Sequence, residues 1–385
     1  MKPTTLKSFC AGISLLVATS SYGADIDISG FATIAAGTTT SNEEQYLGFS
    51  NDFDFNQDSL FALQTSSNLE NGFSVTAQLI ARGRDDWSPS FEWAFLGYEV
   101  NDNWKILAGR QRAPFFMYSD FLDVSYAYHW ISPPAGVYNL AFDSFDGIGS
   151  IYSSQLGEFD STFHAVIGRN QDKITLPASV GGVEVKPDFK NLIGASWTLN
   201  RDWLTLRGGY FQADMTIPVA ALDGLTGGWA ASGFGSIADD LKAEEDKVWF
   251  AELGFQIDYD DIFVIGEFTR LDLKGTGFSN DDSYYISVGK RFDDISIHIT
   301  YGADDDELEN LLANVPTNVA ALAPLYAATQ GIIANEEREE RYVTAGLKWD
   351  FHPVASFKFE VTQFEDNLDN QQDATLVKAA LVTVF

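Results

Sequence analysis

The sequence predicts an all-β protein, a transmembrane antiparallel β-barrel of sixteen strands with a long loop after strand five. Two observations carry this prediction: short segments alternate apolar and polar residues, and the connections between them alternate between tight turns and long loops. The composition agrees, because 30 Phe, 15 Tyr, 9 Trp and 32 Gly in 385 residues are typical of sheets with many turns rather than of helical bundles.

The strands are recognised by their period of two. Ile295, Ile297 and Ile299 alternate with the polar residues Ser296 and His298. The same alternation occurs in segments 73–80, 343–349, 357–362 and 377–385.

The connections fall into two length classes that strictly alternate. Seven are tight turns, at 71–72, 101–103, 157, 200–202, 258–261, 293–294 and 351–355. Eight are long loops, at about 37–57, 83–90, 112–142, 170–189, 214–246, 273–282, 303–339 and 367–373. Eight loops and seven turns connect sixteen strands of about ten residues, as in transmembrane barrels.

A soluble β-sandwich is the alternative fold. It would also alternate, but it rarely segregates long from short connections, and it would bury its apolar face in a core. Here Trp104, Trp203 and Trp349 lie beside short turns on the apolar faces, as an aromatic girdle at a membrane interface would.

Residues 1–23 are expected to be a signal peptide, followed by a single barrel domain, 24–385. Lys2 and Lys7 precede an apolar stretch that is too short to span a bilayer, and small residues precede Ala24. The only cysteine, Cys10, lies in this segment, so the mature chain has no disulfide or zinc-thiolate site. No later run of 18 apolar residues predicts a transmembrane helix.

The net charge of −31 argues against nucleic-acid binding, which requires basic surfaces. Strand parity places a polar set inside the barrel, which therefore should hold water, since sixteen strands enclose more space than side chains fill. That set is Gln64, Gln78, His164, Arg207, Glu252, Gln256, Glu267, Arg291, His298, Lys348, Lys358, Glu360 and Lys378.

The whole mature chain resembles the Gram-negative trimeric general porins. The terminal Phe385 on an alternating last strand resembles their assembly signal, and segment 25–31 resembles their first strand. The third long loop, about 112–142, follows strand five, where these porins place a loop that folds into the barrel. Segments 109–116, 126–130 and 133–134 resemble one subgroup of porin-like proteins.

The resemblance implies a homotrimer in the outer membrane, surrounded by lipid and lipopolysaccharide, that passes small hydrophilic solutes and ions passively through a water-filled channel without a cofactor. It also implies a constriction where wall arginines face acids of the third loop; the candidates are Arg110, Arg112, Asp120, Asp123, Asp143 and Asp146. The candidate pore-lining residues are Arg207, Lys348, Lys358 and Lys378.

This chain departs from the family pattern where charge matters. Strand two has no arginine, and the entry to strand six carries Asp143 and Asp146 instead of basic residues. Two basic against four acidic candidates, together with the acidic loops, predict a modest cation preference that is strongest in dilute salt.

Two other functions are alternatives to a general channel. The first is a substrate-specific channel for sugars or organic anions, in which third-loop aromatics form a binding track; we expect these aromatics to pin the loop to the wall instead. They are Phe115, Phe116, Phe121, Tyr126, Tyr128 and Trp130. The second is a barrel enzyme, which is disfavoured because no Gly-x-Ser-x-Gly or dense Ser/His motif accompanies the four histidines.

Two loop features have simple interpretations. The acidic runs at 281–282, 304–306 and Asp366, Asp369 and Asp373 lack EF-hand spacing, so we expect solvated loop faces that bridge to lipopolysaccharide at most. In loop 303–339, the helical spacing of Leu308, Leu311, Leu312 and Val315 predicts a short helix.

Overall fold

The computed structural model describes residues 25–42, 44–176, 182–368 and 372–385. The expected signal peptide, 1–23, and Asp369 lie outside the described residues. No helix in the described part of the chain is both long and apolar enough to cross a membrane.

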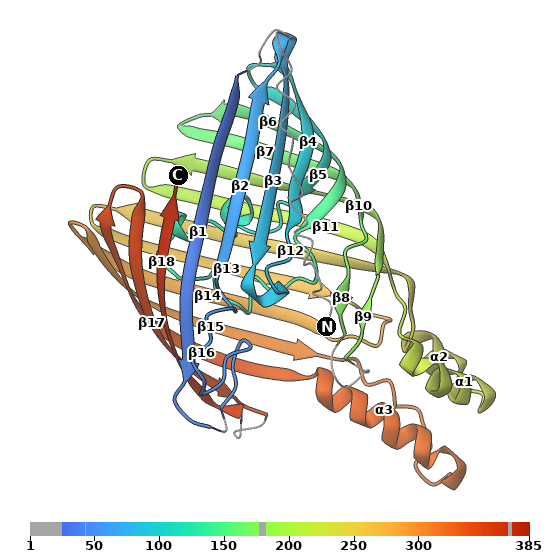
Figure 1. The fold of residues 1–385 in the computed structure, drawn as a ribbon. Helices are drawn as coiled ribbons and strands as arrows, with labels where there is room; N and C mark the ends of the chain where they lie inside the picture. Colours follow the sequence, from blue (N-terminus) through green and yellow to red (C-terminus); the bar gives the residue numbers. More distant parts are fainter. Residues whose placement is uncertain (1–24, 43, 177–181, 369–371) are drawn as a thin grey trace, which may run out of the picture.

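Sixteen antiparallel strands close into one barrel, which confirms the predicted fold (Figure 1). Each strand pairs with its neighbours along the chain, and the barrel closes between the first strand and the last. The strands are β1 Ile26–Thr39, β2 Leu60–Asn68, β3 Phe73–Arg82, β4 Ser90–Asn101, β5 Trp104–Arg112, β6 Ser144–Leu156, β7 Phe159–Asn170, β10 Asp188–Arg201, β11 Leu204–Ile217, β12 Ala243–Tyr259, β13 Ile262–Asp272, β14 Asn280–Phe292, β15 Ile295–Glu307, β16 Arg338–His352, β17 Ala355–Asp366 and β18 Ala374–Val384.

The shorter elements lie in the connections. The strands β8 Ile174–Thr175 and β9 Glu184–Val185 form a separate two-stranded sheet. The helices are α1 Asp223–Ala231, α2 Gly235–Asp240 and α3 Ala323–Glu336, and the 3-10 turns are η1 Glu70–Gly72, η2 Gly83–Asp85, η3 Ser119–Phe121, η4 Ser125–Ala127, η6 Ala220–Leu222 and η7 Ala320–Leu322.

The helices of two long loops pack together and project from the barrel at the end where the long loops lie (Figure 1). Trp229 of α1 is buried there and its Nε1 donates a hydrogen bond to Thr329 Oγ1 of α3 at 2.9 Å. The prediction of a helix over Leu308–Val315 is wrong, because this stretch forms turns. Leu312 and Val315 are instead buried against Trp229, so their spacing reflects packing rather than helical structure.

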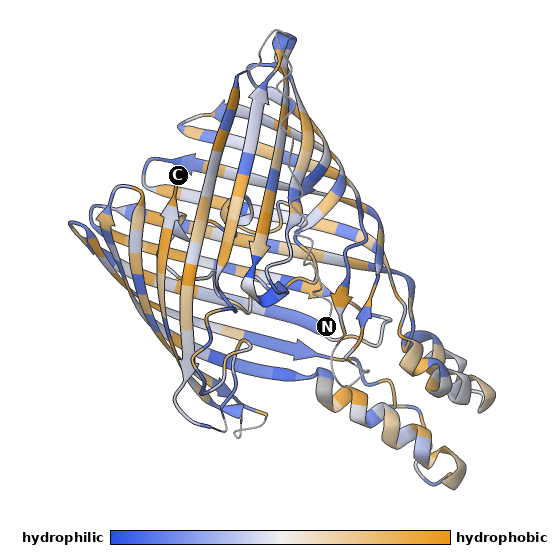
Figure 2. Ribbon diagram, in the orientation of Figure 1, coloured by the Kyte–Doolittle hydropathy of each residue, from blue (hydrophilic) through white to orange (hydrophobic). Residues whose placement is uncertain are grey.

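The outer face of the barrel is apolar and the inner face is polar, as the alternation predicts. Ile295, Ile297 and Ile299 are exposed on the outside, whereas His298 and Thr300 are buried inside. Figure 2 shows hydrophobic and hydrophilic residues alternating along the strands. Trp104 and Trp349 are also exposed, near the short turns, where a membrane interface would place them.

The seam of the barrel depends on the last residue. Phe385 and Gly30 exchange two backbone hydrogen bonds, of 2.8 and 3.0 Å. A Cβ at Gly30 would come within 2.6 Å of the Phe385 ring, so glycine leaves the space into which this ring fits. The ring also stacks on Phe61 of β2, with 5.9 Å between centroids.

Candidate pore constriction

The third loop, residues 113–143, lies inside the barrel and reaches the wall opposite the strand from which it starts. It follows β5, and its contacts include residues of β15, β16 and β17 on the far side of the barrel. Trp130 Nε1 donates to Thr300 Oγ1 at 2.8 Å, and the Ile131 amide donates to Glu360 Oε1 at 2.7 Å. Tyr126 Oη donates to the Pro353 carbonyl at 2.8 Å. The loop therefore crosses the lumen.

Lys358 is the centre of one attachment. Its side chain is 0% exposed, and Nζ donates to the carbonyls of Ser125, Tyr128 and Trp130 and approaches Ser125 Oγ at 3.1 Å. These oxygens supply the ammonium with acceptors in place of water, which a buried charge requires. The loop is thus fixed to β17 through its own backbone.

Glu267 of β13 forms a second attachment. Its carboxylate accepts hydrogen bonds from the Met117 amide at 2.7 Å, from Tyr285 Oη at 2.6 Å and from Tyr138 Oη. Arg207 of β11 donates from Nη2 to the Pro114 carbonyl at 2.6 Å. Polar residues from four wall strands therefore hold the loop at several points along its length.

Aromatic packing completes the attachment. Phe115 packs edge-on against Phe211 and Phe250, with ring centroids 4.9 and 5.4 Å apart, and both Phe115 and Phe116 are buried. These two rings therefore pin the loop to the wall, as expected. Phe121 differs, because it is 52% exposed.

An ionic cluster joins the loop to the wall on its other side. Arg112 contacts Asp123 and Asp143, each at 2.6 Å, and Glu92 at 3.4 Å. Arg82 contacts Glu92 at 2.6 Å and Asp123 at 2.9 Å. Burial acts to raise the pKa of Asp123, but Arg82 and Arg112 outweigh it and hold that pKa well below its usual range. Asp123 therefore stays ionised at neutral pH.

The other constriction candidates lie elsewhere. Arg110 Nη2 contacts Asp172 and Ser144 Oγ, both at 2.8 Å, rather than the third loop. Asp146 is 3.9 Å from Arg110, is 67% exposed and lies on the strand face that carries the exposed Ile148. Asp120 is exposed and forms no ion pair with either arginine in the described part of the chain. The predicted group of six is therefore wrong as a single cluster, and only Arg112, Asp123 and Asp143 come together.

The candidate pore-lining residues also need correction. They face inward as predicted, but three of the four donate to carbonyls of the third loop. Lys348 Nζ lies 3.2 Å from the Tyr126 carbonyl, and Lys358 and Arg207 make the contacts given above. Lys378 faces an open cavity and pairs with Asp58 at 2.9 Å. Most of these basic side chains of the inner wall therefore hold the third loop, and Lys378 lines open space.

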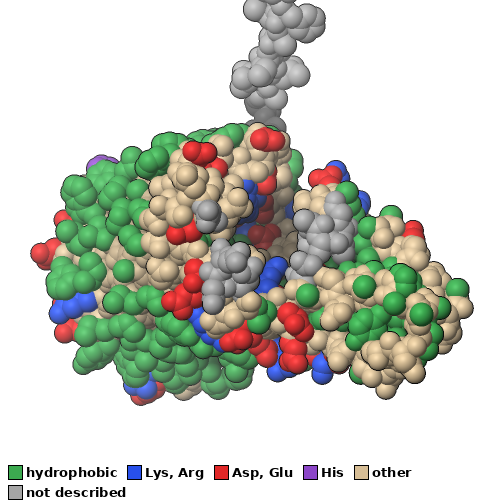
Figure 3. Space-filling view, turned by 90° about the horizontal axis from the view of Figure 1, so that it is seen from below, with side chains coloured by type: hydrophobic (Ala, Val, Ile, Leu, Met, Phe, Trp, Pro, Cys, Tyr) green, Lys and Arg blue, Asp and Glu red, His purple; other side chains and the backbone are tan. Residues whose placement is uncertain are grey.

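Open space remains on both sides of the loop. A cavity of about 720 Å³ lies toward the long loops, lined by Arg82, Asp123 and Lys378 among others. A second, of about 150 Å³, lies toward the short turns and is lined by Asp293 and Lys348. Tyr128 lines both cavities, so the loop separates them. Figure 3 looks onto the long-loop end and shows a hollow with acidic and basic side chains around it.

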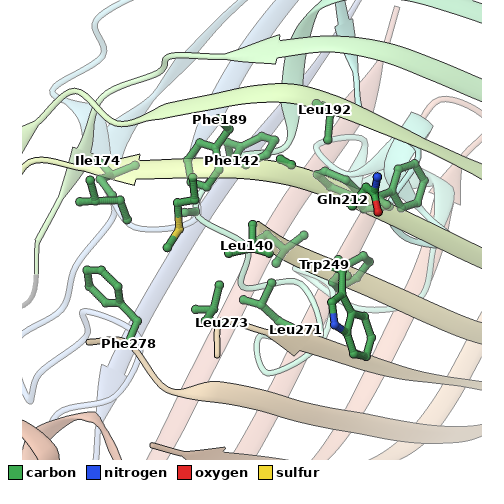
Figure 4. A pocket seen from close by; sticks show the side chains of 18 of the residues that line it. Leu140, Phe142, Ile174, Phe189, Leu192, Gln212, Trp249, Leu271, Leu273 and Phe278 are labelled. Carbon is green, nitrogen blue, oxygen red and sulfur yellow. The ribbon is translucent and has the colours of Figure 1, made fainter. Parts of the chain in front are cut away.

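An apolar pocket of about 460 Å³ adjoins the larger cavity (Figure 4). Phe189, Leu192, Trp249 and Leu271 line it from the wall strands. Residues 140–142 of the third loop line both spaces. The inner face of β10–β13 is therefore apolar near the long loops, which the general expectation of a polar lumen does not anticipate.

Several residues of the site were missed from the sequence. Arg82 is four residues beyond Gln78 on β3, so its parity could have placed it on the inner wall. Glu92 lies at a register shift between β3 and β4, where strand parity no longer predicts which way a side chain points. Asp172 lies in a loop and has no periodic signal.

Comparisons support the fold. No family model matches the sequence, and no curated protein is significantly similar to it. Among solved structures, the chain is similar to a loop-deletion mutant of OmpT, an outer membrane protein of Vibrio cholerae, at 12% identity and a TM-score of 0.57, over 94% of this chain and 99% of that one. It is similar to Salmonella typhi OmpF at 12% identity and 0.58, over 94% and 98%. The outer membrane channel DcaP of Acinetobacter baumannii matches at 10% identity and 0.58, over 95% and 99%. Together with the closed barrel and the inward third loop, these similarities show that the chain has the sixteen-stranded fold of the outer-membrane porins.

Proposed function

We propose that the chain forms a water-filled channel in a Gram-negative outer membrane and passes small hydrophilic solutes and ions by passive diffusion. One observation carries this proposal: the third loop is fixed across the lumen, with a charged, open cavity on each side of it. Such an arrangement restricts passage by size and filters by charge. The likeness to porin structures supports it.

The membrane setting follows from the outer wall. Its apolar band and tryptophans fit lipid, and the acidic long loops suit bridging to lipopolysaccharide through divalent ions. A homotrimer is part of the proposal, and it is supported by one matched structure, Vibrio cholerae OmpT, described in its trimer form.

No catalysis belongs to this proposal. The described chain contains a Ser–His contact, His129 Nε2 to Ser287 Oγ at 2.9 Å, but both side chains are buried. Burial also holds the pKa of His129 well below its usual value. We interpret this pair as an attachment of the third loop to β14.

Weak cation preference is the finer part of the proposal. The described lining of the larger cavity has six carboxylates, Asp58, Glu92, Asp123, Asp143, Asp172 and Glu360, and five basic residues, Arg82, Arg84, Arg110, Lys173 and Lys378. Because acidic and basic residues nearly balance at this cavity, the attraction for cations comes mainly from the net negative charge of the loops. Salt screens this attraction over about 8 Å at physiological ionic strength.

The test is reconstitution of the purified, folded protein. We expect stepwise ohmic conductance in planar bilayers, and swelling of liposomes in small sugars but not in large oligosaccharides. A potassium chloride gradient should give a reversal potential on the cation side that grows in dilute salt. Absence of conductance steps from barrels shown to be folded would refute the channel, and saturation by one sugar would favour a substrate-specific channel instead.

A further inference from the structure

Three carboxylates meet on the inner wall at the long-loop end of β14 and β15. One oxygen each from Asp281, Asp304 and Asp306 lies within 4.8 Å of the other two. Asp281 and Asp306 are direct cross-strand partners. Like charges placed opposite each other destabilise a sheet, so this arrangement calls for a compensating positive charge.

The positive charge supplied by the chain is too small. Asp306 Oδ2 lies 3.5 Å from Arg338 Nε, and Glu340 adds a further carboxylate opposite Asp304 in β16. Among the residues that the structure describes, the ion pair with this group of four acids comes from Arg338.

Hydrogen bonding within the group is also incomplete. Ser283 Oγ lies 2.7 Å from Asp281 Oδ1 and 2.6 Å from Asp304 Oδ1. A hydroxyl has one hydrogen and can donate to only one of these oxygens.

The observation that points to a ligand is an oxygen of Asp306. This side chain is 9% exposed, and its Oδ1 is buried and accepts no hydrogen bond. An unsatisfied buried carboxylate oxygen is costly. Asp304 beside it is only 3% exposed, and the third loop passes over it at Gly136, where a Cβ would lie 3.4 Å from the Asp304 Cβ.

We infer that Asp281, Asp304 and Asp306 bind one Ca²⁺ beneath the third loop, and that this site is separate from the channel function proposed above. Carboxylate oxygens are the ligands that Ca²⁺ prefers. Oxygens bound at about 2.4 Å to one ion lie at most about 4.8 Å apart, and these three meet that limit. The inference revises the expectation that the acidic run at 304–306 is only a solvated loop face. The ion would tie β14 to β15 and offset the charge next to Gly136.

The test is calcium titration of the full chain, refolded in detergent without lipopolysaccharide and stripped with chelator, at pH 7.5. Calorimetry should show one Ca²⁺ per chain with a dissociation constant of about 0.1–1 mM, the range of extracellular sites. The double variant Asp304→Asn/Asp306→Asn should bind at least about 10-fold more weakly, because affinity follows ligand charge.

The matched control is Asp282→Asn/Asp305→Asn. Asp282 and Asp305 lie on the same two strands as the proposed ligands, and the two substitutions remove the same amount of negative charge. Their carboxylates, however, pair with Arg270 and Arg341 on the outer face of the barrel. The control should bind Ca²⁺ within about twofold of the native chain. If the native chain binds no Ca²⁺, or if both double variants lose binding equally, the inference is overturned. Folding of each variant is checked by heat-dependent gel mobility, and Asp306→Asn alone replaces the double variant if that one does not fold. Calorimetry measures Ca²⁺ binding independently of conductance. A chain that binds no Ca²⁺ therefore contradicts only the calcium site, and a folded chain without conductance contradicts only the proposed channel.

Discussion

Replacing Lys358 by methionine should release the third loop while leaving the barrel closed. Methionine fills a similar volume but donates no hydrogen bond. The substitution leaves the carbonyls of Ser125, Tyr128 and Trp130 without their shared donor, in a site where Lys358 is 0% exposed.

The size of the effect follows from burial. Each hydrogen bond from a charged donor contributes about 1.5–3 kcal/mol, but the ammonium also loses its hydration, and the contributions do not add. Breaking one side of a buried charged arrangement costs about 3–5 kcal/mol. At about 1.4 kcal/mol per tenfold, this shifts the equilibrium from the docked toward the undocked loop by about 10² to 4 × 10³-fold.

Single-channel recording in planar bilayers measures the result. Lys358→Met should raise the mean conductance and the open-channel noise, because residues 125–130 lose their attachment to β17. Lys290→Met is the control: it removes the same charge from an exposed position on β14, where the ammonium lies over the Phe292 ring, and it should conduct like the native chain. If a folded Lys358→Met barrel shows native conductance and noise, the attachment does not set the width of the pore.

Further predictions concern the same loop and the seam. Deleting residues 115–130 should raise conductance above that of Lys358→Met, and unchanged conductance in a folded deletion variant would place the loop outside the current path. Deleting Phe385 should reduce the yield of heat-modifiable barrels, because β18 loses two hydrogen bonds to β1; a normal yield would contradict that role of the seam. Arg82→Gln should increase cation preference in a potassium chloride gradient, because Glu92 and Asp123 lose one of their two guanidinium partners, and an unchanged reversal potential would remove Arg82 from the ion path. The lowered pKa of Asp123 keeps its ion pairs intact above the ordinary carboxyl pKa of about 3.9, and they are lost only as the pH falls through the lower folded value. Asp123 should therefore contribute no change in conductance between pH 7 and pH 5, and a step in this range that Asp123→Asn abolishes would show that the two arginines do not hold Asp123.

The fold could be predicted from the sequence because successive residues of a barrel strand face outward and inward in turn, so apolar and polar residues alternate along the strand. Parity placed Lys358 and Glu267 correctly on the inner wall, since that information is local. It could not show that both contact the third loop, because their partners lie far away in the chain: Met117 and Glu267 are 150 residues apart.

The constriction was only partly predictable for a related reason. Arg112 and Asp123 were identified because one ends a strand and the other lies in the long loop that follows it. Asp120 is also an acid of this loop, but it lies in the 3-10 turn η3 and is exposed, whereas Asp123 follows that turn and pairs with Arg82 and Arg112. Loop direction has no periodic signal, so the choice between the two acids required coordinates.

The long sequence separation across the lumen sets an order of events in assembly. The far-wall partners of the third loop, from Arg207 to Glu360, follow the loop in the chain, and Glu360 and Lys358 lie on the next-to-last strand. Before β17 has joined the barrel, the third loop lacks its contacts with Lys358 and Glu360. The narrow passage can therefore form only when the wall is nearly complete, and a partly assembled intermediate would be a wide, leaky ring. Addition of β17 thus determines when the third loop first gains its attachments on the far wall.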